Sequence, residues 1–206
     1  MGAIARVLRV RTCVIFALLA LATLAQGKTV AAGEWKLVPA DSRVSFVSIK
    51  NNAIAEVHRF AELTGGVSAE GKVLVEVPLA SVATGIEIRD QRMRDLLFDV
   101  AKTPKASVTL DVDTQKLRAL SPGEHVLLKL AALLTLHGVT YPFPGEARIT
   151  RTSDSEWLVT SERPSIVETV NFGLINGVDE LRKVAGLQSI GSAVPVTFSL
   201  TFVSHQ

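Results

Sequence analysis

LASVATGIEIRDQRMRDLLF, residues 79–98, is the stretch on which the fold assignment depends, because it interrupts a chain that otherwise has the pattern of a β protein. Within it, Arg89 and Asp90 stand between the apolar side chains of Ile88 and Met93. Apolar and ionic residues alternate too closely for a plain surface loop, and the second half of the stretch is compatible with a short helix. We expect this insert to form the lid or rim of an apolar container.

Outside the insert, apolar residues from Glu34 onward recur mostly with period 2, in short runs separated by turn residues. This pattern is typical of antiparallel sheets. Turn sequences AEGK, SPGE and SDSE, at 69–72, 121–124 and 153–156, predict that neighbouring strands pair in sequence order. A second helical segment is expected at 178–185. The predicted strands are 43–50, 53–64, 72–78, 107–120, 125–136, 141–151, 156–166 and 193–203, with a shorter piece at 67–68.

These segments predict an all-β fold in one domain. Antiparallel strands in one domain must stack as two sheets or close into a barrel, because open edges invite aggregation. Closure around a filled or ligand-holding interior is the lipocalin solution. We expect a single antiparallel lipocalin-like β-barrel of about eight strands with one or two short helical inserts.

The N-terminal residues have the pattern of a secretory signal peptide. Three arginines precede an apolar run at 13–24, which is short for a membrane span. We expect residues 1–25 to be the signal peptide, with cleavage after Ala25 or as late as residue 32, and a retained N-terminal anchor as the alternative. The mature protein is then periplasmic or secreted.

Removal of this segment changes the charge balance. Of the 22 Lys and Arg against 20 Asp and Glu, three arginines lie within residues 1–25, which leaves 19 against 20. A nearly neutral chain gives no support for nucleic-acid binding, which needs a clustered basic face. The single cysteine, Cys13, lies in the predicted signal, so the mature chain forms no disulfide and depends on a hydrophobic core.

Catalytic and metal-binding motifs are missing from the sequence. It contains no G-x-S-x-G elbow, phosphate-binding glycine loop or Cys-His pair, although a scattered Ser-His-Asp site stays open. His58 and His137 are too isolated to predict a metal site, and we expect structural roles for them. Glu56, like other acids on predicted strands, is expected on the solvated outer face. The sequence therefore predicts no enzyme, no metal and no cofactor.

A succession of short motifs resembles the YceI-like domain family over about residues 34–203. The motifs are Trp35 with DSRVSF at 41–46, Gly65 or Gly66, SVAT at 81–84, RD and RM at 89–90 and 92–93, FDV at 98–100 before Pro104, LTLHGVT at 134–140 and NFGL at 171–174. The resemblance implies a secreted or periplasmic lipocalin-like barrel that binds a long isoprenoid or related lipid, with no established catalysis. This chain departs from the family pattern at 170–171 and 91–93. The identity of the lipid's head group therefore cannot be transferred from the family to this chain.

Bulky apolar residues on the predicted strands and insert are sufficient to line a lumen. The alternative is that they are core residues of a filled barrel or sandwich. The predicted lumen residues are Phe46, Val57, Phe60, Ile86, Ile88, Met93, Phe98, Leu134, Leu136, Phe172, Leu174 and Phe198.

Arg89 and Arg92 are predicted at the rim, since they share a face of a short helical turn. They either bind a lipid head group or belong to an ion-pair cap. Asp90 and Arg94 are spaced to pair with each other.

These expectations define an exported carrier or storage protein for a long isoprenoid-type or fatty lipid, with no nucleic-acid partner. Transient contact with a membrane or membrane protein is compatible with this role. Two alternatives stay open. One is a secreted enzyme or redox accessory acting on a bound isoprenoid quinone. The other is an interaction barrel with a filled interior.

Overall fold

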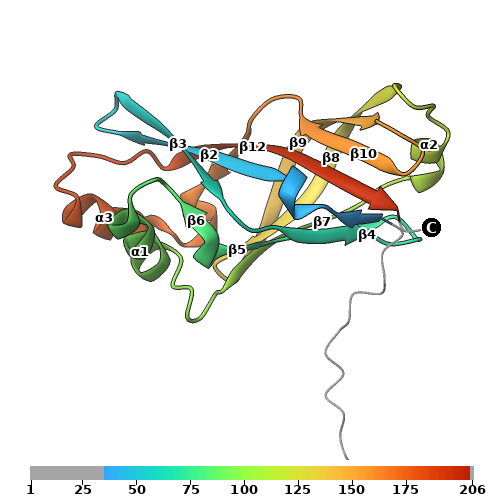
Figure 1. Cartoon of the computed structure of the whole chain (residues 1–206). Coiled ribbons are helices and arrows are strands. Elements are labelled where there is room, and N and C mark those ends of the chain that lie inside the picture. Colours follow the sequence, from blue (N-terminus) through green and yellow to red (C-terminus); the bar gives the residue numbers. More distant parts are fainter. Residues whose placement is uncertain (1–34, 205–206) are drawn as a thin grey trace, which may run out of the picture. The chain divides into compact units, whose positions relative to one another are not determined.

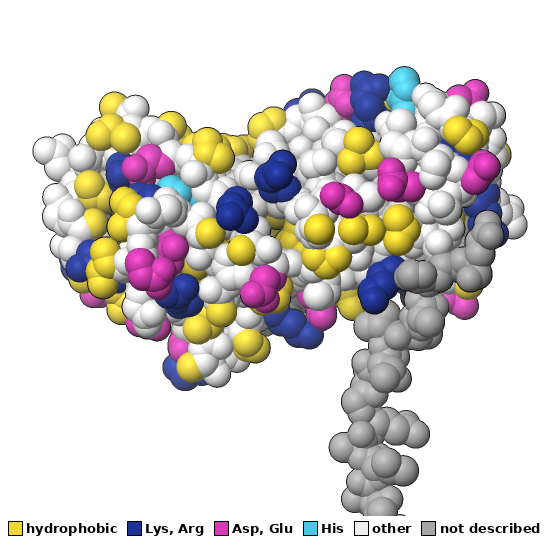
Figure 2. All heavy atoms as spheres, in the orientation of Figure 1, with side chains coloured by type: hydrophobic (Ala, Val, Ile, Leu, Met, Phe, Trp, Pro, Cys, Tyr) yellow, Lys and Arg dark blue, Asp and Glu magenta, His cyan; other side chains and the backbone are white. Residues whose placement is uncertain are grey.

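The computed structural model describes residues 35–204 of the 206-residue chain. The predicted signal peptide and its cleavage site lie outside these residues. No helix within 35–204 is long and apolar enough to span a membrane. Basic and acidic side chains are interspersed over the face of the molecule shown in Figure 2.

Eight antiparallel strands close into a ring, which confirms the predicted barrel (Figure 1). The last strand returns to the first, with Trp35 opposite Ser204 and Leu37 opposite Phe202. In ring order the strands are β1 (Trp35–Leu37), β4 (Thr64–Val67), β5 (Lys72–Pro78), β7 (Lys105–Asp111), β8 (His125–Leu136), β9 (Val139–Arg151), β10 (Glu156–Ser161) and β12 (Ala193–Ser204).

The long strand β12 belongs both to the ring and to an extension of the sheet. Its C-terminal half pairs with β10 on one edge and β1 on the other. Its N-terminal half pairs with β11 (Ser165–Glu168) and β2 (Arg43–Lys50). From β2 the sheet continues through β3 (Ile54–Phe60) to β6 (Val82–Ala83). The barrel wall therefore extends past the ring at one end.

The insert at 79–98 is helical where the sequence predicts it. A short turn, η2 (Leu79–Ser81), and β6 lead into α1 (Glu87–Arg92), and a single π-helical turn, η3 (Met93–Leu97), follows directly. The second predicted helix is α3 (Ile175–Val184), and Figure 1 shows α1 and α3 at the same end of the barrel. Gly177 lets α3 approach η3, because a Cβ there would lie 2.6 Å from the carbonyl oxygen of Leu96. The remaining short turns are η1 (Pro39–Asp41) and η4 (Thr169–Phe172).

Three predicted strands are wrong in their extent. The strand predicted at 107–120 ends at Asp111, and α2 (Thr114–Arg118) follows. Asp113 caps α2, since its carboxylate accepts hydrogen bonds from the amides of Gln115 and Lys116. The segment 53–64 divides into β3 and the start of β4. The segment 156–166 is broken before Ser165 by Pro164, which has no amide to donate to a ladder.

Two tryptophans pack at the end of the barrel near α2. The rings of Trp35 and Trp157 meet edge to face with centroids 5.8 Å apart. The guanidinium of Arg118 lies over the first ring, and that of Arg151 lies over the second. Both tryptophans are buried, so this end of the barrel is packed with side chains.

Candidate lipid-binding cavity

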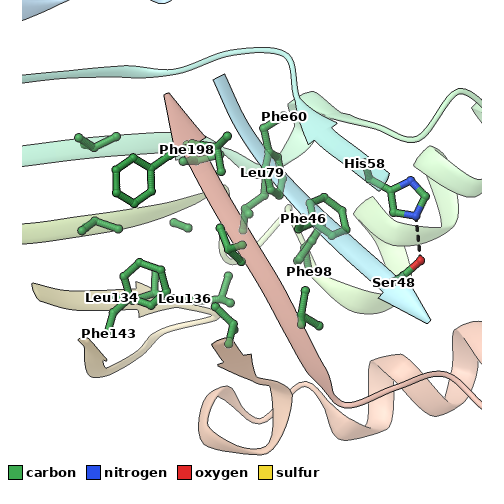
Figure 3. A pocket seen from close by; sticks show the side chains of 18 of the residues that line it. Phe46, Ser48, His58, Phe60, Leu79, Phe98, Leu134, Leu136, Phe143 and Phe198 are labelled. Atoms are coloured by element: carbon green, nitrogen blue, oxygen red, sulfur yellow. Dashed lines mark hydrogen bonds between the residues drawn. The ribbon is translucent and has the colours of Figure 1, made fainter. Parts of the chain in front are cut away.

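The barrel encloses a cavity of about 640 Å³. This volume is in the range of small-molecule sites, which is roughly 300–1,000 Å³. Figure 3 shows apolar side chains from separate elements converging on it, among them Phe46, Phe98, Leu134 and Phe143. The interior is therefore not filled by its own side chains.

The alternation of β8 determines which of its residues reach the cavity. Leu130, Ala132, Leu134 and Leu136 line the cavity. Leu133, between two of them, is 46% exposed on the outer surface. Successive side chains of a strand point to opposite faces, so the apolar sequence of this strand serves both.

Ten of the twelve predicted lumen residues line the cavity. Ile86 and Ile88 do so while staying about half exposed, which places them at its mouth. Whether these residues contact a ligand stays a prediction. The ten are Phe46, Phe60, Ile86, Ile88, Met93, Phe98, Leu134, Leu136, Leu174 and Phe198.

Val57 and Phe172 are not lumen residues. Val57 is 73% exposed, because it is three positions from Phe60 on the same strand and so points to the opposite face. Phe172 is buried but does not line the cavity. Its ring packs edge to face against Tyr141, and its carbonyl lies 3.3 Å from Nδ1 of His137.

One end of the cavity is polar. In the β2–β3 pairing, Phe46 lies opposite His58 and Ser48 lies opposite Glu56. All four side chains line the cavity, as does Lys50 at the end of β2. The lumen wall therefore changes from apolar to polar toward the β2–β3 hairpin, and Glu56 does not lie on the outer face as predicted.

Both predicted rim arginines line the cavity, and Arg89 is fully engaged in contacts within the protein. Its Nε donates to Thr84 Oγ1 at 2.8 Å and its Nη2 donates to the Thr84 carbonyl at 2.7 Å. Its Nη1 donates to Glu56 Oε2 at 2.6 Å, and the same oxygen lies 2.8 Å from Nζ of Lys50. The two cations lower the pKa of Glu56, with the hydrogen bond from Lys50 as the largest cause. Arg92 donates a long hydrogen bond, 3.4 Å, to the carbonyl of Val184.

The predicted pairing of Asp90 with Arg94 is wrong. Asp90 is buried and accepts hydrogen bonds from the amide and hydroxyl of Thr84. Arg94 instead lies 2.9 Å from Glu87. The π-helical turn begins at Met93, which takes Arg94 out of the α-helical i,i+4 spacing on which the prediction relied.

His58 is a buried histidine beside this ion-pair network. Only 4% of it is exposed, and its Nε2 lies 2.8 Å from Ser48 Oγ (Figure 3). Burial lowers the pKa of His58, and the positive charge of Arg89 lowers it further. The ring is therefore neutral near pH 7. Among residues 35–204, no group of three or more potential ligands could hold a metal ion.

The model of the YceI-like domain family matches residues 35–202. The chain belongs to the YceI-like family. No curated protein matches this YceI-like sequence.

Solved structures share the fold of this YceI-like domain. A polyisoprenoid binding domain from Saccharophagus degradans, described as implicated in plant cell wall breakdown, is 35% identical with a TM-score of 0.82, over 84% of this chain and 99% of that chain. Burkholderia cenocepacia BcnA is 17% identical with a TM-score of 0.62, over 80% and 98% of the two chains. The Campylobacter jejuni YceI protein is 14% identical with a TM-score of 0.52, over 72% and 85%. The last two similarities concern the fold alone.

The polar end of this YceI-like cavity was not predicted from sequence. The signal was present, since period 2 counted from Phe46 reaches Ser48 and Lys50, and counted back from Phe60 it reaches His58 and Glu56. Polar residues at inward positions of a lipid-sized cavity are candidates for contact with a ligand's polar group.

Proposed function

We propose that this YceI-like protein is an exported carrier or storage protein that binds a long isoprenoid-type or fatty chain inside its barrel. The observation that carries the proposal is the apolar cavity of about 640 Å³. One water molecule takes up roughly 30 Å³ in the liquid, and a methylene group is of similar size. The cavity therefore has room for about twenty such groups.

The energetics of burial support this ligand class. Each buried methylene contributes about 0.8 kcal/mol, so ten of them contribute about 8 kcal/mol before the cost of association. Useful affinity therefore requires no ion pair to the ligand. Among ligand classes, a hydrocarbon chain gains the most binding free energy from burial in an apolar lumen of this kind.

Similarity to a known binder supports the isoprenoid assignment. The Saccharophagus degradans domain, named for polyisoprenoid binding, is 35% identical to this chain, and the match covers 99% of that domain. Export is supported by the arginines and apolar run of residues 1–25. A periplasmic or secreted carrier must exchange its lipid with a membrane or a membrane protein, and we propose this transient contact as part of the function.

A lipid-acting enzyme is the second candidate, and one contact favours it. Ser48 Oγ and His58 Nε2 are 2.8 Å apart, the geometry of a nucleophile and its base. Within the described residues, however, Nδ1 of His58 has no carboxylate to orient the ring. Binding is therefore the better supported function. Turnover of a prenyl ester that disappears in Ser48→Ala with binding unchanged would favour the enzyme.

Native mass spectrometry of protein purified gently from its own host tests the carrier. We expect an added mass that organic extraction identifies as a long-chain lipid. A homogeneous ligand-free mass, with no lipid in the extract, would contradict the proposal.

A further inference from the structure

Two buried polar atoms at the cavity lack a hydrogen-bond partner. Within residues 35–204 they are Nδ1 of His58 and Oγ1 of Thr169, the only such side-chain atoms there. Both residues are less than 5% exposed, and both line the cavity. Buried polar groups are nearly always paired in native proteins, so two orphans on one cavity point to a partner that the chain itself does not supply.

Both orphans lie in the part of the wall that extends past the ring. His58 is on β3, and the neighbouring strands are β2, β12 and β11 in that order. Thr169 directly follows β11, where its amide donates to the carbonyl of Ser192. The lumen on the other side of Phe46 is apolar through to Trp35 and Trp157. An amphiphile with its chain among the apolar strands would bring its head group to this polar end.

The charges at this end are already largely matched within the protein. Each nitrogen of the Arg89 guanidinium donates to Thr84 or Glu56, and Lys50 pairs with the same carboxylate. The buried carboxylate of Asp90 is a second negative charge there, since it accepts from the Thr84 hydroxyl to which Arg89 also donates. Arg92 is the one cation lining the cavity that no carboxylate within residues 35–204 pairs. A phosphate monoester carries close to two negative charges near neutral pH. Arg92 at the mouth could balance one of them, and the other would be buried without a partner.

The neutral ring of His58 suits a neutral ligand oxygen. With Nε2 bonded to Ser48, Nδ1 donates or accepts according to the tautomer, and a hydroxyl group matches either case. The rings of Phe46 and His58 are in contact, with centroids 5.2 Å apart, so apolar surface borders this polar group.

We propose that the polar end of the cavity binds an uncharged head group with a hydrogen-bonding oxygen, such as a prenyl alcohol, in preference to a prenyl phosphate. His58 is its hydrogen-bonding partner, and Thr169 is the second polar group available there. This inference rests on the proposed function, since the same cavity must hold the hydrocarbon chain.

Three twenty-carbon probes test the inference: geranylgeraniol, geranylgeranyl phosphate and phytane, an isoprenoid hydrocarbon. Both tryptophans of the chain, Trp35 and Trp157, line the cavity, so quenching of their fluorescence reports occupancy. At pH 7.5 we expect the alcohol to bind about tenfold more tightly than the hydrocarbon or the phosphate, the value of one good hydrogen bond. In His58→Phe the alcohol should bind no better than the hydrocarbon, whose affinity should stay within about twofold of wild type.

The matched control is His125→Phe, because His125 is exposed and does not line the cavity. It should keep the wild-type preference for the alcohol. The ranking of the three probes on wild-type protein decides the matter even if the His58 variant fails to fold. Equal binding of alcohol and hydrocarbon would overturn the inference and leave the carrier function intact. The same holds if the phosphate binds most tightly of the three probes and loses this affinity in Arg92→Gln. If none of the three probes binds, the carrier function and the inference fail together.

Discussion

Arg89 and Glu56 form an ion pair across the polar end of the cavity, with Nη1 2.6 Å from Oε2. The pair joins α1 of the helical insert to β3 of the sheet extension. Arg89 also holds Thr84 by two hydrogen bonds, so one side chain fixes the insert, its preceding loop and the wall. Of the two roles expected for this arginine, the structural ion pair is the one that the geometry favours.

Breaking this pair should destabilise the protein more than breaking a surface pair. Arg89→Gln and Glu56→Gln should each lower the free energy of unfolding by about 1–2 kcal/mol, because each leaves half-buried partners unsatisfied. A double-mutant cycle measured by urea unfolding should give a coupling energy of about 1 kcal/mol. The control is Lys72→Gln, whose exposed pairing with Asp111 at 3.6 Å should contribute less than about 0.5 kcal/mol. Additive effects at Arg89 and Glu56 would contradict this account of the pair.

His58 should make stability depend on pH in the mildly acidic range. Its pKa in the folded protein is below the usual 6.5, mainly because the ring is buried. Below about pH 6.5 the unfolded chain therefore binds a proton that the folded chain does not, and stability falls as the pH falls. The slope approaches about 1.4 kcal/mol per pH unit at most.

Urea unfolding of wild type and His58→Gln at several values between pH 7.5 and 5 measures this effect. The difference in unfolding free energy between the two proteins should shrink or reverse as the pH falls. His125→Gln should track the wild type. Parallel curves for wild type and His58→Gln would show that the folded state does not oppose protonation of His58.

Filling the cavity should weaken binding, and adjacent residues of β8 that face opposite sides of the wall provide the variant and its control. Ala132 is buried and lines the lumen, whereas Leu133 is 46% exposed. Ala132→Trp should weaken lipid binding by at least about tenfold, since the indole occupies space needed by the chain. Leu133→Trp adds a similar ring outside and should leave affinity unchanged. Affinity unaffected by Ala132→Trp would place the ligand elsewhere.

Alanine substitutions at Phe172 and Val57 should differ sharply in their effect on the stability of the protein. Phe172→Ala removes a ring that is 2% exposed and should cost about 3–5 kcal/mol. Val57→Ala, at a site that is 73% exposed, should change stability by less than about 0.5 kcal/mol. Thermal unfolding gives both values. A Tm for Phe172→Ala close to that of wild type would contradict its assignment to the packed core.

The predicted all-β barrel is confirmed, and the period-2 signal behind it is clear in β12, where the larger apolar residues from Val194 to Phe202 alternate with mostly polar ones. The strand at 125–136 has the observed bounds, and the short helix expected in the second half of the 79–98 stretch corresponds to α1 and η3. The strand predicted at 107–120 is wrong at its end, because Asp113 caps a short helix and its capping preference competes with the continuing apolar pattern. The family assignment from the order of the motifs is also confirmed.

The candidate site was only partly predictable. Ten lumen residues follow from their apolar character. Side chains of β3 alternate between the two faces of the sheet, so Phe60 and His58 point into the cavity, whereas Val57 points outward and was predicted wrongly. The pair of Arg89 with Glu56 joins residues 33 positions apart. It depends on the pairing of β3 with β6, and no local spacing in the sequence reveals that contact.

Photo-cross-linking with a diazirine-bearing geranylgeranyl probe, followed by mapping of adducts by mass spectrometry, tests the central claim most directly. Binding inside the barrel predicts adducts at inward residues such as Val108, Leu134 and Phe198, and their loss in Ala132→Trp. Adducts confined to outward residues such as Val57 and Leu133 would contradict a ligand in the lumen.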